Sequence, residues 1–467
     1  MKTKDIIFMS MMLIMLSVVS CLKTIDDEEE EVEIKMLIPD ENEPFHTNTR
    51  DIAVPNAVSI AFSDGQTNVN NPFEGQGVTV SVNRQNVTIT STITDIEVNY
   101  VLSGNTNDGF VKIYGDYRFG LVLNGVSIKN PTGAAINIQS GKRASVTLVD
   151  NTFNRLIDVG IFQKTEGEDM KATFFSEGQL IFDGTGNLLV YGNTEHAIRS
   201  DDYIRVNNGN IMVKNAIKDG IHSNDYFEMN GGNINIYAQS DGVECGKGYI
   251  TINGGIIKIN ADGDGLKSVD NLAILGGNIE IESLGNGISV VSNIIVTGGE
   301  IYCYSGKKGI VSEEGAIVVM GGLVVASAKK NVFDCDQQMF SITGGTAVGV
   351  GGATIIPTSG ECRQRVVVWG TSKFTVGQLV SIKSADNSEV LTFKVPKAYS
   401  GNMALVFTSS ALQANTSYTI YKGGNVTGGS DFHGLYSGAV SSGGTAEATF
   451  TTSAMVTAVG DVNAQEQ

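Results

Sequence analysis

The chain contains the stretch GNINIYAQSDGVECGKGYITING (residues 232–254), followed directly by GIIKINADGDGLKSVDNLAILG (residues 255–276). Both segments place glycines, aliphatic residues and an Asp-Gly pair at the same phase, and neighbouring segments repeat the pattern. The repeats begin at Gly186, Gly209, Gly232, Gly255, Gly277, Gly299 and Gly322. These starts are 23, 23, 23, 22, 22 and 23 residues apart. A fixed period of this length indicates a repeat architecture.

Each repeat holds three short strand signals separated by Gly, Asn and Asp, a spacing too short for helices. The sequence therefore predicts an all-β fold, a right-handed parallel β-helix with 22–23 residues per turn. Successive turns should stack about 4.8 Å apart, so that one phase of the repeat forms one column. Two aliphatic columns should point inward. The first consists of Ile211, Ile234, Ile257, Ile279 and Ile301, and the second of Ile198, Ile221, Val243, Leu266, Ile288 and Ile310.

The ends of the chain predict further segments. Residues 1–21 resemble a lipoprotein signal peptide, with basic residues, a short apolar run and Cys21 as the lipid anchor. Residues 22–53 include the acidic run DDEEEEVE and should form a disordered tether. An acidic run just after the lipid-anchor Cys resembles the surface-export signal of some Gram-negative lipoproteins, which implies an outer-membrane lipoprotein exposed at the cell surface; alternatively, the run is a solvated spacer. We expect the β-helix over residues 54–370. A small antiparallel β module should follow over residues 371–467, where strand signals alternate and an open edge of the coil needs a cover.

Charge and cysteine usage exclude some functions. The formal net charge is −18, with no basic cluster to neutralise phosphates, so we expect no nucleic-acid partner. Cys245, Cys303, Cys335 and Cys362 lack zinc spacing, and we expect buried thiols rather than disulfides. Nothing indicates an oligomer, so we expect a monomer that meets a membrane only through its anchor.

One outward column raises an electrostatic question. It reads His196, Asp219, Asp241, Asp264, Asn286 and Lys308. Two carboxylates one strand spacing apart repel by about 3.5 kcal/mol at an effective dielectric constant of about 20. Either their pKa values are raised or a cation lies between them, and oxygen ligands on turns suit Ca²⁺, although Mg²⁺ or Na⁺ stays possible. Asp262 and Glu244 are close enough in sequence to complete the site. Alternatively, the Asp residues serve only as good turn formers.

A second polar cluster follows the short strand expected in GIHS (residues 220–223). Asp201 and Asp202 lie on one turn, and Asn224 and Asp225 on the next. This corner is about five residues, or about 16 Å of extended chain, from the first column. It would be a separate metal site, unless these residues too are turn formers.

Outward residues on the strand after each Gly-Asn suggest a ligand surface. Tyr and Lys along a flat sheet can stack on sugar rings and pair with uronate carboxylates. The candidate carbohydrate-binding residues are Tyr191, Lys214, Tyr237, Lys258, Tyr203 and Tyr226. Exposed Tyr is also common in strands because of its β propensity alone.

Several stretches together resemble a known family. They include YVLSGNTNDGFVKIYGD (residues 100–116), DGIHSNDYFEMNGGNINI (residues 219–236) and DGDGLKS (residues 262–268). They are similar to bacterial carbohydrate-binding domain proteins built on a right-handed parallel β-helix, over about residues 56–425. The resemblance implies the fold of pectate-type polysaccharide lyases, bound Ca²⁺ between turns, and binding of acidic or cellulosic plant polysaccharide. The family's turns match Asp219, Asp241 and Asp264, and also Asn224 with Asp225, whereas the pattern lapses at EHAIRS and KKGIVS.

Two functions of different classes, and a third in reserve, follow. The first is a surface lipoprotein that binds an acidic, pectin-like polysaccharide through a calcium-bearing β-helix without cleaving it. The second is a Ca²⁺-dependent, pectate-type lyase, for which Lys267 is a weak candidate base, because an ammonium among carboxylates should keep its proton. The third is a structural or adhesive surface protein. No His pair, serine triad or carboxylate pair indicates a hydrolase.

Overall fold

The computed structural model describes residues 45, 47–63, 65–160, 162–335 and 339–462. The expected signal peptide, Cys21 and the acidic run lie outside these residues. Every regular element in the described part of the chain is a β-strand. No helix there has the length and apolar character that crossing a membrane requires.

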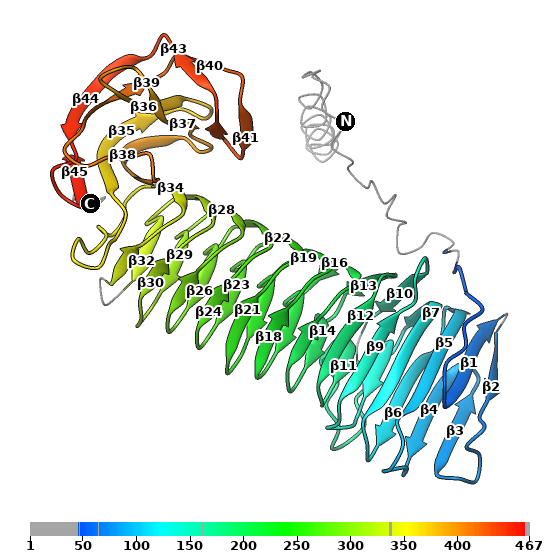
Figure 1. Ribbon diagram of the computed structural model, residues 1–467. Helices are drawn as coiled ribbons and strands as arrows, with labels where there is room; N and C mark the ends of the chain where they lie inside the picture. Colours follow the sequence, from blue (N-terminus) through cyan, green and yellow to red (C-terminus); the bar gives the residue numbers. More distant parts are fainter. Residues whose placement is uncertain (1–44, 46, 64, 161, 336–338, 463–467) are drawn as a thin grey trace, which may run out of the picture. The chain divides into compact units, whose positions relative to one another are not determined.

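The chain coils through three parallel faces, and each repeat contributes one strand to each face (Figure 1). Face 1 consists of β3 (Val78–Asn83), β4 (Asn86–Ser91), β6 (Phe110–Gly115), β8 (Ile136–Ile138), β11 (Ala172–Ser176), β14 (His196–Ser200), β17 (Ile221–Ser223), β20 (Val243–Cys245), β23 (Leu266–Ser268), β26 (Ile288–Val290), β29 (Ile310–Ser312) and β32 (Phe333–Cys335). Face 2 consists of β9 (Ala144–Leu148), β12 (Leu180–Gly184), β15 (Ile204–Val206), β18 (Tyr226–Met229), β21 (Tyr249–Ile252), β24 (Leu272–Ile274), β27 (Ile294–Val296), β30 (Ile317–Val319) and β33 (Phe340–Ile342). Face 3 consists of β10 (Phe153–Asp158), β13 (Asn187–Gly192), β16 (Asn210–Ala216), β19 (Asn233–Ala238), β22 (Ile256–Ala261), β25 (Asn278–Ser283), β28 (Glu300–Ser305), β31 (Leu323–Ala328) and β34 (Thr346–Gly351).

The first turns are less regular. They contain β1 (Ala57–Ser63), β2 (Gln66–Asn70), β5 (Val98–Thr106) and β7 (Phe119–Asn130). Strand β7 pairs with β9 through its first half and with β10 through its second half, so it passes from face 2 to face 3. The change of direction occurs near Gly125, which has a φ of 68°. Face 2 and face 3 therefore share their first strands.

The two aliphatic columns predicted from the repeats are confirmed. Ile211 pairs in register with Ile234, and Ile234 with Ile257, and all three are buried. The column through Ile221 continues in register to Val243 and beyond on face 1. Burying stacked aliphatic side chains contributes about 25 cal/mol per Å² of apolar area, which makes the centre of the coil its main source of stability. The four cysteines of the described residues are free thiols and buried, as expected.

The repeat-starting glycines form a third column, at the corner between face 2 and face 3. Six of these glycines, from Gly209 to Gly322, have φ between 80° and 117°. Residues with a side chain disfavour this conformation. A Cβ on Gly255 would also lie 2.7 Å from the carbonyl oxygen of Gly232, one turn away. The corner thus requires glycine both for its backbone conformation and for the close approach of successive turns.

A small module follows the coil, as expected from the change in sequence pattern. It contains β35 (Val366–Phe374), β36 (Leu379–Ser384), β37 (Glu389–Lys394), β38 (Tyr399–Thr408), β39 (Ser417–Lys422), β40 (Asn425–Thr427), β41 (Ser430–Phe432), β42 (Leu435–Ser437), β43 (Val440–Ser442), β44 (Thr445–Thr451) and β45 (Val456–Gly460). Strand β38 pairs antiparallel with both β34 and β35, which ends the parallel stacking. The first strand of the module, β35, begins at Val366.

Both ends of the outer surface of the coil are covered. Ile52 and Val54 pack on Val101 and Val122 of the first turns, and the backbone of Arg50 makes two hydrogen bonds with the side chain of Asn124, of 2.9 and 2.8 Å. Residues 47–53, at the end of the expected tether, therefore pack on the coil. At the other end, Val325 and Val348 on the outside of face 3 share a hydrophobic core with Trp369 and Phe407 of the module.

Candidate functional site

The outside of face 3 changes character along one column. In register, this column reads Asn235, Lys258, Glu280, Tyr302, Val325 and Val348. The last two are apolar because the module covers them, whereas the first three face solvent. The uncovered part of face 3 therefore spans β19, β22 and β25, with the module as a wall at one end.

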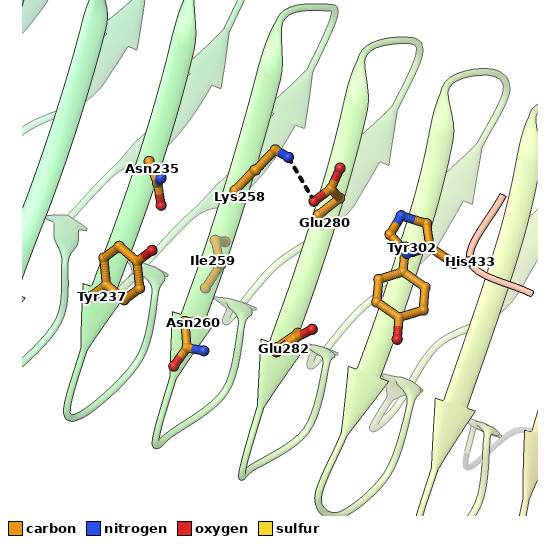
Figure 2. Close-up of a pocket in the computed structure, with 9 residues that line it drawn as sticks. All are labelled: Asn235, Tyr237, Lys258, Ile259, Asn260, Glu280, Glu282, Tyr302 and His433. Carbon is orange, nitrogen blue, oxygen red and sulfur yellow. Dashed lines mark ion pairs between the residues drawn. The ribbon is translucent and has the colours of Figure 1, made fainter. Parts of the chain in front are cut away.

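A groove lies on this uncovered part (Figure 2). Its residues are Asn235, Tyr237, Lys258, Ile259, Asn260, Glu280, Glu282, Tyr302 and His433. Tyr237 has 42% of its surface exposed, so its ring is available to a ligand. Lys258 pairs with Glu280, with 3.1 Å between Nζ and Oε2. An exposed ring among amides and carboxylates can stack on a sugar and bond to its hydroxyls.

The module closes one end of the groove through His433. Its imidazole stacks on Tyr302, with ring centroids 3.8 Å apart and an angle of 8° between the rings. His433 lies in the turn between β41 and β42, with a φ of 49°. Burial lowers the pKa of His433, so the ring is neutral at pH 7. Sequence reasoning missed His433, because it lies in the module, outside the repeats, and only the folded module brings it to Tyr302.

The structure corrects one candidate. Tyr191 was expected to point outward in line with Lys214 and Tyr237, but only 4% of its surface is exposed. The pairing of β13 with β16 shifts after Val190, and Tyr191 aligns with Asn215 instead of Lys214. On its other side it aligns with buried Ile157, so it belongs to the covered part of face 3.

Lys214 and Tyr237 are neighbours on the uncovered part. The ammonium of Lys214 lies 5.7 Å from the ring centroid of Tyr237, within cation–π range. The register between β16 and β19 shifts after Val213, which places an extra residue of β16 beside Tyr237. The bulge accounts for a 23-residue repeat at this point.

Tyr203 and Tyr226 lie on the outside of the corner that leads into face 2. Their rings are stacked on each other, 4.4 Å apart. Tyr226 stacks in turn on Tyr249, a residue of the same phase that sequence reasoning left out. Because stacked rings cover each other's faces, Tyr226 has no free face for a sugar.

The acidic column on face 1 is a ladder of side-chain-to-backbone hydrogen bonds. Asp219 Oδ1 accepts the backbone N–H of Asp241 at 3.1 Å, and Asp241 Oδ1 accepts that of Asp264 at 2.7 Å. Asp264 Oδ1 accepts the N–H of Asn286 at 2.6 Å, and Asn286 Oδ1 accepts that of Lys308 at 3.2 Å. An amide thus performs the same function as a carboxylate. The acceptor explains why these residues are Asp or Asn, but it does not require the charge.

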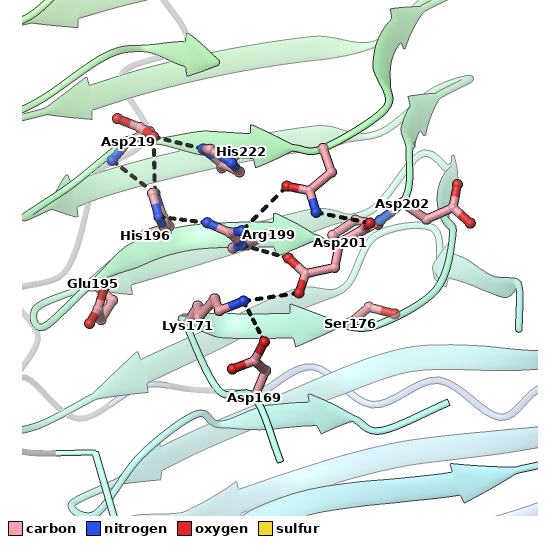
Figure 3. A network of polar contacts seen from close by, with 12 residues as sticks. Asp169, Lys171, Ser176, Glu195, His196, Arg199, Asp201, Asp202, Asp219 and His222 are labelled. Carbon is pink, nitrogen blue, oxygen red and sulfur yellow. Dashed lines mark hydrogen bonds and ion pairs between the residues drawn. The ribbon is translucent and has the colours of Figure 1, made fainter. Parts of the chain in front are cut away.

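The charge of Asp219 is balanced by two imidazoles (Figure 3). Its Oδ2 lies 3.1 Å from His196 Nδ1 and 2.9 Å from His222 Nδ1. Burial alone would raise the pKa of Asp219, but the hydrogen bonds from the two histidines outweigh burial and hold this pKa far below its usual range. Burial lowers the pKa of His196. At His222 burial would lower the pKa, but the hydrogen bonds that its imidazole makes to the carboxylates of Asp219 and Glu244 outweigh burial and raise this pKa.

On the next turn, the carboxylate of Asp241 pairs with an ammonium group, that of Lys267. Lys267 Nζ lies 2.9 Å from both Asp241 Oδ2 and Glu244 Oε1. Burial would lower the pKa of Lys267, but the hydrogen bonds to the two carboxylates outweigh it and raise this pKa. Burial raises the pKa of Asp241. A lysine held in its charged form cannot accept a proton, which argues against Lys267 as a base.

The column fits a hard cation only in part. Asp219, Asp241 and Glu244 offer carboxylate oxygens that all lie within 4.8 Å of one another, a donor set that suits Ca²⁺. Asp264 and Asp262 are not part of this group. Asp219 and Asp264 are two turns apart, about 9.6 Å, which is too far for one ion. A cation would compete with the Lys267 ammonium, whose long side chain is 42% exposed and free to turn away.

The second expected metal site is assembled differently. Asp201 joins Asp169 and Glu177, two acids of an irregular turn that sequence reasoning missed. Lys171 lies 3.1 Å from Asp201 and also contacts Asp169 (Figure 3). The carboxylates of Asp202 and Asp225 are in no acidic or histidine cluster of the described residues.

Asp202 and Asn224, two residues of the expected second metal site, make hydrogen bonds to the preceding turn of the coil. Asp202 accepts a hydrogen bond from Gln179, and Asn224 donates to the backbone carbonyl of Asp201 at 3.1 Å. Each bond joins residues 23 positions apart, on successive turns of the coil, so hydrogen bonds between turns hold these side chains.

The ladder predicts unequal effects of two substitutions at Asp264. Asp264→Asn keeps the acceptor for the N–H of Asn286 and removes a charge that no cation of the described residues pairs, so urea unfolding should change by less than about 0.5 kcal/mol. Asp264→Ala leaves that N–H without its acceptor and should cost about 1–2 kcal/mol. Equal losses in the two variants, measured in the absence of divalent ions, would contradict the ladder.

A family model described as "Carbohydrate-binding domain-containing protein" matches residues 83–285 and 263–431, more than half of the chain. A solved structure titled "polysaccharide lyase-like protein from C. thermocellum, Gadolinium derivative" is 28% identical, with a TM-score of 0.44, and the match covers 56% of this chain and 96% of that one. A comparison with curated proteins found no match. The chain belongs to the family of carbohydrate-binding domain-containing proteins.

Proposed function

We propose that this protein binds an acidic, pectin-like polysaccharide of plant cell walls and does not cleave it. Family membership supports polysaccharide binding in general. The observation that carries the proposal is the groove on face 3, where the exposed ring of Tyr237 lies among amides, carboxylates and Lys258. A pectate-type lyase is the alternative, and the charged state of Lys267 speaks against it.

The groove suits the sugar rings and hydroxyls of a polymer. From β16 to β28 the face offers four strand spacings, about 19 Å, along the axis of the coil. Glu280 and Glu282 accept hydrogen bonds from hydroxyls, while Asn235 and Asn260 both donate and accept. Contacts to each sugar are few, so repeated contacts along the polymer supply avidity.

Gel retardation tests the groove. The purified protein should be retarded in gels that contain polygalacturonate, and Tyr237→Ala should reduce the retardation severalfold, because stacking on one ring contributes about 1 kcal/mol. Tyr421→Ala, which alters a ring of the module outside the groove, is the matched control. No absorbance of unsaturated uronate should develop. Sustained, Ca²⁺-dependent product formation would instead establish the lyase.

We further propose that Ca²⁺ binds at Asp219, Asp241 and Glu244. When bound, the ion would neutralise the carboxylates that Lys267 and His222 otherwise balance, and it would tie adjacent turns together. The support is the convergence of three carboxylates from neighbouring turns of face 1. Asp201, with Asp169 and Glu177, is a second candidate of the same kind.

Removing the competing ammonium tests this site. Lys267→Met should show a larger increase in melting temperature on adding Ca²⁺ than the wild-type protein, because binding stabilises the folded state by RT ln(1 + [L]/Kd), about 2.7 kcal/mol at 100 times Kd. Lys258→Met, which removes an ammonium from the groove, should respond to Ca²⁺ as the wild type does. If neither the wild type nor Lys267→Met distinguishes Ca²⁺ from chelator, the calcium proposal is wrong.

The sequence outside the described residues supports a location. We propose that the protein is a monomeric outer-membrane lipoprotein, acylated at Cys21 and exposed at the cell surface, where large polysaccharides are accessible. Metabolic labelling with a fatty acid should mark the wild-type chain and leave Cys21→Ser unlabelled. Labelling of both chains, or of neither, would rule out Cys21 as the anchor.

A further inference from the structure

A second outward column begins face 2 and is independent of the groove. It occupies the position just before each strand of that face. In register it reads Arg118, Arg143, Gln179, Tyr203, Tyr226 and Tyr249. All six side chains are partly or fully exposed. The coil therefore aligns two guanidinium groups, an amide and three phenols along one line.

The three tyrosines form a continuous stack. Tyr203 and Tyr226 have centroids 4.4 Å apart and an angle of 10° between rings, and for Tyr226 and Tyr249 the values are 5.1 Å and 2°. These separations are close to the spacing of parallel strands, so the register of the coil sets the stack. The inner faces are all occupied. Tyr203 ends the stack on one side, where Gln179 is the next residue of the column, and the guanidinium of Arg205 lies 5.6 Å from the Tyr203 ring centroid.

Tyr203 borders a hollow on that side. The hollow is also lined by Arg118, Lys142, Arg143 and Gly141. Three cations in one hollow stand out in a chain whose net charge is −18. Gly141 leaves the space open, because a Cβ there would meet no atom within 4 Å. The combination of an aromatic side chain at the border and three cations suits a sugar that carries a carboxylate.

The cations of the hollow are only partly balanced. Glu97 lies 2.9 Å from Arg118 and 3.6 Å from Arg143. Asp116 also lines the hollow, so three cations face two carboxylates. The Nε of Arg143 is buried and makes no hydrogen bond within the described part of the chain.

The groove on face 3 has the opposite character. Glu280 and Glu282 line it together with a single cation, Lys258, which is already paired with Glu280. One surface thus suits sugar rings and hydroxyls, and the other suits an acidic group. A polysaccharide that contains both kinds of unit would find a matching surface for each.

We propose that the hollow formed by Arg118, Lys142, Arg143 and Tyr203 is a second glycan site that binds uronate units. This inference rests on the proposed function, because it assigns recognition of the acidic units of the same polysaccharide to a separate surface. The Arg guanidinium groups bind the carboxylate, and the side chain of Tyr203 at the border of the hollow contacts the sugar ring. Neutral sugars lack the group that the cations recognise.

Calorimetric titration with a short oligogalacturonate and with a neutral cello-oligosaccharide tests the site. Arg143→Gln should raise the Kd for the oligogalacturonate about tenfold, which equals about 1.4 kcal/mol, and leave binding of the neutral sugar unchanged. Gly141→Tyr should have the same effect by filling the hollow, and its backbone conformation and open surroundings allow it to fold. Lys330→Gln, an exposed cation elsewhere on the coil, is the charge-matched control.

The outcomes separate this inference from the proposed function. If Arg143→Gln and Gly141→Tyr bind the oligogalacturonate as the wild type does, while Tyr237→Ala still weakens binding of the polymer, the second site is wrong and the groove stands. If the wild type binds neither the oligomers nor polygalacturonate, both proposals are wrong. Melting temperatures of the two variants within a few degrees of the wild type confirm that they fold.

Discussion

The hydrogen-bonded stacking of parallel strands, about 4.8 Å apart and in register, is the constraint on which this molecule depends. It forces every phase of the repeat into a straight column, inside or outside. Inside, the result is a series of aliphatic ladders such as Ile211, Ile234 and Ile257. At one corner it brings backbones so close that only glycine fits. Outside, it places similar side chains on neighbouring turns next to each other, so that carboxylates repel one another and aromatic rings stack.

Like charges in a column need compensation, and this protein supplies it locally. The Asp residues are retained at their phase as acceptors for the N–H of the next turn, a task that Asn286 performs without charge. The carboxylate of Asp219 contacts two imidazoles and that of Asp241 an ammonium, whereas Asp264 has no cationic partner among the described residues. A cation would therefore enter a site that already has internal counter-charges, and its affinity would depend on displacing them.

The outer columns divide the surface into covered and open parts. Val325 and Val348 are apolar because the module packs on them, and Ile52 and Val54 cover the first turns. The surface between these covers stays polar and carries the groove. The same register that builds the groove on face 3 also stacks the tyrosines beside face 2, with their inner faces occupied. Columns of one fold thus offer two surfaces of different charge.

The sequence alone determined the architecture, because a strict period of 22–23 residues with aliphatic and glycine positions permits only one way to bury its apolar side chains. It also determined which residues share a column, since register follows from phase. Only the tertiary structure decided what each column meets. The register shift at β16 separates Tyr191 from the column of Lys214, and the folded chain buries Tyr191. The module, far away in sequence, brings His433 to Tyr302, and the irregular turns bring Asp169 and Glu177 to Asp201. These contacts join segments that share no period, so no local pattern announces them.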